Sequence, residues 1–222
     1  MDHWNAVAED RLVLADLIAG LPPERLHGPS LCSAWTVRDV ASHVLAMATT
    51  SKGAVLASYV RHGANFEATN DALAADASQG RSDEQLIEAL RASAGARHTP
   101  PGLKAEGVFG ELVTHLADIA LATDRTVELP ADHLTTTLAY LARRRKGNTR
   151  FTLTRHGRQP VLEVEERIRG IRLEATDVAW TIGEGLEVQG PALALAAAMA
   201  GRTGALDHLS GDGVAELRSK DR

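Results

Sequence analysis

Apolar residues recur every three or four positions along the first two thirds of the chain, which is the spacing of amphipathic helices. The first such segment covers residues 3–20, with Leu14 and Ile18 on its apolar side. Gly20 and the pair Pro22-Pro23 are expected to end it, because neither residue type continues a helix well.

A second helix is predicted to begin after Thr36, since Asp39 three residues later completes a capping-box-like arrangement. Its apolar stripe predicts a helix as far as about Tyr59. Residues 61–80 mix Asn, Gly, Ser and Gln with alanine, which predicts a loop or a short helix. Three further helices are predicted: from Ser82 to before Pro100, over 107–123 and over 132–145.

The pattern changes near Asn148, where short alternating runs typical of strands begin. Strands are predicted at 151–154, 161–164, 171–175, 178–182 and 186–188, with Gly183-Glu184-Gly185 in a hairpin. Residues 191–200 are almost purely Ala, Leu and Met, which predicts a buried helix, and a short helix follows Gly213. We therefore expect a two-domain α+β protein with a helical domain at 1–147 and a small α+β domain at 148–222.

Composition and charge exclude several functional classes. Hydrophobic residues make up 44% of the chain, and its net charge is −5, without the basic surface typical of nucleic-acid binding. The basic run at 143–146 is interpreted as a helix end, with a nucleic-acid patch as the alternative. Because no signal peptide or spanning segment is recognisable, we expect a cytoplasmic protein that binds neither nucleic acid nor membrane, as a monomer or homodimer.

Glu111 and His115 lie four residues apart on a predicted helix, so their side chains share one face and could hold one metal ion. His43, on the helix capped by Thr36, is the best candidate for a third ligand, because facing helices of a bundle often share a metal. Asp118 could orient a ligand histidine, or could be a solvated carboxylate. The alternative for the Glu111–His115 pair is an ordinary surface pair.

The remaining reactive side chains fit weaker interpretations. Cys32, the single cysteine, could be a nucleophile, but a buried structural thiol is favoured because nothing nearby in sequence lowers its pKa. Five histidines are predicted to be exposed: His3, His62, His98, His133 and His156. No Ser/His/Asp triad and no dinucleotide fingerprint is present in the sequence.

Three ordered motifs resemble the mycothiol-dependent maleylpyruvate isomerase family, which belongs to the DinB-like metal-binding superfamily. The first motif is PSLCSAWTVRDVASHV at 29–44, and the second is ELVTHLAD at 111–118. The third covers 173–190, Gly201-Arg202 and 209–213, and resembles the C-terminal domain of the family.

The resemblance implies a DinB-like four-helix bundle and a sterol-carrier-like C-terminal domain. It implies zinc held by His43, Glu111 and His115, although these ligand types also accept nickel or iron. Mycothiol would be the cosubstrate, with a metal-bound thiolate attacking an electrophilic small molecule, and Arg202 matches an arginine that could bind the substrate. The isomerase arginine expected after the His43 helix is missing from residues 65–71, unless Arg61 substitutes.

That departure leaves a thiol S-transferase at least as well supported as an isomerase. Two other classes remain open: a non-catalytic metal-binding regulatory or interaction protein, and a small-ligand carrier that uses the C-terminal domain. A fourth protein ligand closing the metal site would favour the regulatory class.

Overall fold

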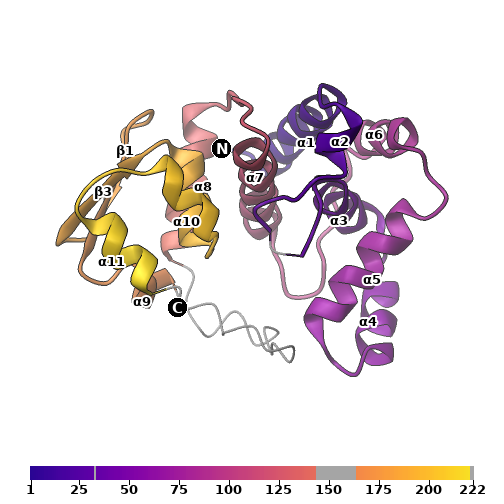
Figure 1. Cartoon of the computed structure of the whole chain (residues 1–222). Coiled ribbons are helices and arrows are strands. Elements are labelled where there is room, and N and C mark those ends of the chain that lie inside the picture. The colour runs from indigo at the N-terminus through magenta and orange to yellow at the C-terminus, as the bar shows by residue number, and fades with distance from the viewer. Residues whose placement is uncertain (33, 144–163, 221–222) are drawn as a thin grey trace.

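The computed structural model describes residues 1–32, 34–143 and 164–220, and it places a helical N-terminal region beside a small mixed α/β unit (Figure 1). Helices α8 and α10 lie between α7 of the N-terminal region and the strands of the C-terminal unit. The expected change from all-helical to mixed structure is therefore confirmed.

The helices of the N-terminal region are α1 (His3–Ala19), α2 (Pro23–Leu26), α3 (Val37–Thr49), α4 (Lys52–Arg61), α5 (Phe66–Ser78), α6 (Asp83–Ala92), α7 (Ala105–Ala122) and α8 (Ala131–Ala142). The C-terminal unit contains α9 (Val164–Arg167), β1 (Ile171–Ala175), β2 (Thr181–Ile182), β3 (Leu186–Gly190), α10 (Ala192–Met199), the 3-10 helix η1 (Thr203–His208) and α11 (Gly213–Ser219).

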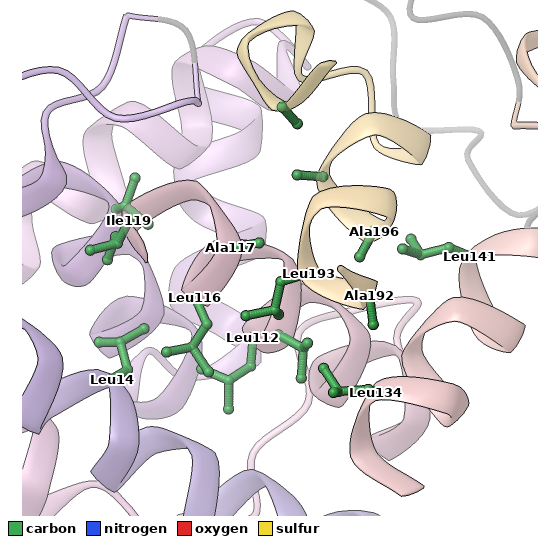
Figure 2. Close-up of a cluster of buried hydrophobic side chains, with 14 of the residues drawn as sticks. Leu14, Leu112, Leu116, Ala117, Ile119, Leu134, Leu141, Ala192, Leu193 and Ala196 are labelled. Atoms are coloured by element: carbon green, nitrogen blue, oxygen red, sulfur yellow. The ribbon is translucent and has the colours of Figure 1, made fainter. Parts of the chain in front are cut away.

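Helix α7 is the central element of the hydrophobic core. It packs against α1 and α3 on one side and against α8 and α10 on the other. Figure 2 shows Leu112 and Leu116 of α7 beside Leu193 of α10, and Ala196 of α10 on the side of Leu141 of α8. All eight residues of α10 are buried, which confirms the buried helix predicted at 191–200. Because α10 packs on α7, the C-terminal unit and the helix that carries His115 share one core.

The sheet has the order β2-β1-β3. Strand β1 pairs in parallel with β3 and antiparallel with β2. Strands β2 and β3 therefore lie on opposite sides of β1 and do not pair with each other. The hairpin expected at Gly183-Glu184-Gly185 is therefore wrong: this segment crosses the end of β1. Gly185 has φ +120, and a Cβ there would lie 2.1 Å from the Gly170 carbonyl oxygen, so the crossing requires glycine.

The long helix predicted from Thr36 to Tyr59 is divided in the structure. Helix α3 ends at Thr49, and Ser51 caps the start of α4 by accepting a hydrogen bond from the backbone N–H of Ala54. A serine that caps a new helix competes with continuation of the old one, which the apolar stripe alone does not reveal. In the weakly patterned segment 61–80, Asn65 caps the 13-residue helix α5.

The strand predicted at 151–154, and the first three residues of the strand predicted at 161–164, lie outside the described residues. Val164, the last residue of the second of these runs, begins helix α9 instead. Only the end of the strand predicted at 178–182 forms, as β2. In the described part of the chain, no helix is long and apolar enough to cross a membrane.

Candidate functional site

Helix α3 positions His43 through a well-defined start. The Thr36 side chain accepts a hydrogen bond from the Asp39 backbone N–H, while the Asp39 carboxylate accepts one from the Thr36 backbone N–H, which is the predicted capping box. His43 follows on the side of α3 that faces the protein interior and is only 7% exposed. Burial, with a smaller contribution from His115, lowers the pKa of His43 to about 3, so its imidazole is neutral at physiological pH.

Helix α7 brings His115 to His43. Their ring centroids lie 5.1 Å apart, edge to face, although the two residues are 72 positions apart in the sequence. His115 Nδ1 lies 2.9 Å from Asp118 Oδ2, one helical turn further along α7. This contact fixes the orientation of the His115 ring and leaves its Nε2 available for a ligand.

Arg202, from the C-terminal unit, holds Asp118 from the other side. Its Nε donates to Asp118 Oδ1 at 2.8 Å and its Nη2 donates to Oδ2 at 3.1 Å. Burial alone would raise the pKa of Asp118, but Arg202 and His115 outweigh it, and the pKa lies below its ordinary value. Asp118 is therefore an anion in a fully buried position, a state that needs this pairing.

Glu111 lies one turn before His115 on α7 and is half-buried. Burial acts to lower the pKa of Arg202, but Asp118, then Cys32 and then the Glu111 carboxylate outweigh it and raise that pKa above its ordinary value. Glu111 thus acts electrostatically on the same guanidinium that holds Asp118. The side chains of His43, His115, Asp118 and Arg202, with Glu111 beside them, form the unit that we call the histidine cluster.

Trp35 forms a wall of the histidine cluster. Its ring centroid lies 4.9 Å from that of His43 and 6.3 Å from that of His115, and its Nε1 donates to Asp71 Oδ1 of α5 at 2.7 Å. Neither Trp35 nor Asp71 was predicted from the sequence to belong to the site. Trp35 lies within the first motif, but a sequence spacing does not reveal a contact between rings, and nothing in the sequence links Asp71 to position 35.

Cys32 lies in the loop that leads to Trp35, and it is half-buried rather than fully buried. Its Sγ lies 3.6 Å from Arg202 Nη2. The neighbouring Leu31 backbone N–H donates to the Asp118 carbonyl oxygen at 3.1 Å. The loop is therefore attached both to α7 and to the C-terminal unit at the histidine cluster.

His133, predicted to be exposed, is buried, so that prediction was wrong. Its Nδ1 lies 2.9 Å from Asp10 Oδ1 of α1, and its ring lies edge to face against Phe109. The apolar positions around His133 predict which face of α8 is buried, but they do not reveal that α1 supplies a buried partner for His133. His3, His62 and His98 are partly buried, and His156 lies outside the described residues.

The fit of the histidine cluster to a metal ion can be tested on its own atoms. His43 Nδ1 is buried without a hydrogen-bond partner, and the neutral imidazole of His43 is the form that binds metals. Within residues 1–32, 34–143 and 164–220, however, no group of three or more His, Cys, Asp and Glu side chains is gathered closely enough to hold one ion. His43 and His115 thus offer nitrogen ligands that suit a metal. The Glu111 carboxylate does not complete a three-ligand group with them in this structure.

Together, the helical region, the mixed unit packed on α7 and the paired buried histidines define a two-part protein with a histidine-based candidate site. Residues 7–101 match the family model described as mycothiol maleylpyruvate isomerase N-terminal domain. The N-terminal region is therefore similar to the N-terminal domain of that family, which the first motif predicted.

Two solved structures resemble the whole chain. One is a crystal structure of the mycothiol-dependent maleylpyruvate isomerase, with 15% identity, and the other is a histidine-to-alanine mutant of that enzyme, with 12% identity. Each match has a TM-score of 0.54 and covers 95% of this chain and 92% of the other. At this identity the likeness concerns the fold. No curated protein matches the chain in sequence.

Proposed function

We propose that the chain is a mycothiol-dependent enzyme acting on an electrophilic small molecule, either by transferring the thiol to it or by isomerising it. A divalent metal, which we take to be zinc, would be held by His43, Glu111 and His115. The observation that carries the proposal is the pairing of two buried histidines, 5.1 Å apart, from two helices. The match of residues 7–101 to the family model supports mycothiol as the thiol.

The charge balance of the histidine cluster favours a cation. His43 is neutral, and Arg202 is matched by the Asp118 carboxylate. The Glu111 carboxylate then gives the cluster an excess of negative charge. A divalent cation bound between the histidines would draw this carboxylate toward it, which is the movement the proposal requires.

When bound, zinc with three protein ligands keeps a coordination position open and lowers the pKa of a thiol that enters it. The chain's own residues then act around that position. His115 is held in one orientation by Asp118, and Asp118 by Arg202. Trp35 covers the His43 ring and restricts access of water from that side. The exposed part of Arg202 is the proposed contact for an anionic substrate.

The choice between isomerase and S-transferase depends on a second arginine. Arg61, the candidate substitute for the arginine expected after the His43 helix, lines a cavity among α3, α4, α5 and α6 whose lining does not include His43, Glu111 or His115. This placement favours an S-transferase acting on an electrophile that needs fewer cationic contacts than maleylpyruvate.

The finer fold assignments belong to the same proposal. We propose that α1, α3, α6 and α7, which pack on one another, are the four helices of a DinB-like bundle, that the division between the domains falls at 147/148, and that the C-terminal unit is sterol-carrier-like. We also propose a cytoplasmic location, because the proposed cosubstrate is a thiol of the cell interior.

The direct test is turnover. Zinc-loaded protein is mixed with mycothiol and, in separate reactions, with maleylpyruvate and with a fluorogenic alkylating electrophile. The proposal expects thiol-dependent product in at least one reaction, and loss of it in His115→Ala but not in the matched control His208→Ala. Metal-loaded protein that converts neither substrate would favour the non-catalytic metal-binding alternative.

A further inference from the structure

We propose that the cavity among α3, α4, α5 and α6 is a second ligand site, which binds a small molecule with an apolar body and one anionic head group. Its volume is about 630 Å³, within the range of small-molecule sites. We call it the α4 cavity. The proposal does not depend on the reaction proposed for the histidine cluster.

The lining of the α4 cavity is apolar in its walls and cationic at its edge. Small or aliphatic side chains from all four helices form the walls: Leu45, Ala54, Ala57, Leu73, Ala77, Ala89 and Ala92. The charged lining residues are Arg61, Arg81 and Asp76, so the excess charge is positive. An apolar surface beside two guanidinium groups matches an amphipathic anion in both shape and charge.

The two arginines come from different elements of the cavity lining. Arg61 is the last residue of α4, whereas Arg81 lies in the turn between α5 and α6. The backbone at Arg81 is fixed, because Arg38 donates to its carbonyl oxygen at 2.8 Å while also pairing with Asp83. The Arg81 guanidinium donates to the Ala77 carbonyl oxygen, which holds it over α5.

Helix α4 is the wall best able to adapt to a ligand. Ser58 is its only buried residue, while Leu56 and Val60 are 60% and 70% exposed. A helix with so little buried surface has low local stability and can move without unfolding the core. Ligand contact with Ala54 and Ala57 would therefore add apolar burial that α4 lacks.

The α4 cavity shares α3 with the histidine cluster and α5 with Asp71, but it uses the opposite side of each helix. On α3, Leu45 and Thr49 follow His43 by two and six residues, or roughly 200° and 240° around the helix. On α5, Leu73 and Ala77 follow Asp71, the partner of Trp35, by the same two steps. A ligand in the α4 cavity therefore lies directly behind the wall that positions Trp35.

The test uses octanoate as the anionic probe, with octan-1-ol and octyltrimethylammonium as neutral and cationic probes, followed by calorimetric titration and thermal unfolding. Octanoate is expected to bind at least about tenfold more tightly than either control probe. Arg61→Gln and Arg81→Gln are each expected to weaken it about threefold to tenfold, as for a partly exposed ion pair, while Arg25→Gln leaves it unchanged.

Ala57→Phe is expected to abolish octanoate binding, because the new ring would occupy the cavity. Ala57 is exposed and lies on α4, and circular dichroism checks that the variant is folded; Ala54→Phe is the second filling variant. Absence of octanoate binding at millimolar concentration, equal binding of octan-1-ol, or binding that survives both filling variants would overturn the proposal. Thiol-transfer activity is measured separately, so its failure would leave these outcomes unchanged.

Discussion

Arg202 grips Asp118 with two hydrogen bonds, of 2.8 and 3.1 Å, although the two residues are 84 positions apart in the chain. Asp118 in turn contacts His115 Nδ1. The C-terminal unit therefore contributes directly to the orientation of a histidine in the N-terminal region. This connection explains why the candidate site requires both parts of the protein.

Asp118→Asn should weaken zinc binding by about 10-fold to 100-fold, because His115 would lose the carboxylate that orients it. A competition titration against a zinc chelator measures the affinity. The same variant should also be less stable by about 1–3 kcal/mol, since Arg202 would keep a partly buried charge without a charged partner. If the variant is destabilised but binds zinc with unchanged affinity, Asp118 stabilises the fold and does not orient a metal ligand.

Arg202→Gln should resemble Asp118→Asn, and the double variant should cost much less than the sum of the two. Residues in one ion-pair network are not independent, so the second change removes an interaction that is already broken. Urea unfolding of the two single variants and the double variant measures the coupling. Strictly additive losses would contradict the pairing as the basis of both effects.

Asp10 makes stability depend on pH. Burial raises its pKa from 3.8 to about 6, against the opposing effect of His133. Between these two values the folded protein binds more protons than the unfolded chain, so stability falls as pH rises, by about 2–3 kcal/mol in total. Asp10→Asn lacks this loss, so the stability of the variant relative to the original protein should rise by that amount between pH 4 and pH 7.

Urea unfolding at several pH values measures this difference, with the exposed Asp212→Asn as the matched control. The free energy of unfolding of the control should change with pH in the same way as that of the original protein. If the stability of Asp10→Asn follows the same pH dependence too, the pKa of the Asp10 carboxyl does not change on folding.

Two glycine-to-alanine changes should have opposite signs. A Cβ at Gly110 of α7 would lie 2.4 Å from Tyr140 Cδ1, so Gly110→Ala should separate α7 from α8 and cost about 1–3 kcal/mol. A Cβ at Gly53 of α4 meets nothing within 4 Å, so Gly53→Ala should stabilise by about 0.5–1 kcal/mol. Thermal unfolding distinguishes them, and a stabilising Gly110→Ala would contradict the close packing of Tyr140.

Local signals predicted much of the fold, because caps and apolar periodicity act over a few residues. The capping box of Thr36 and the all-buried α10 are examples. The division of α3 from α4 was missed, since Ser51 acts as a cap without interrupting the apolar stripe. The burial of His133 was missed because its partner, Asp10, comes from a helix 123 positions away.

The candidate site divides in the same way. The spacing of Glu111, His115 and Asp118 placed them on one helix, and the capped helix after Thr36 made His43 the candidate third ligand. Trp35 as a wall and Arg202 as the partner of Asp118 depend on tertiary packing, which no spacing encodes. Arg202 was predicted to meet substrate, and the structure places its guanidinium on Asp118 and beside Cys32.

Metal analysis tests the central claim most directly. The protein is saturated with zinc, freed of excess metal and assayed for bound zinc, beside His43→Ala, Glu111→Ala, His115→Ala and the control His208→Ala. The proposal expects about one zinc per chain in the original protein and in the control, and strongly reduced zinc in each of the other three variants. Equal zinc content in all five proteins, or none in the original, would contradict a metal site built from His43, Glu111 and His115.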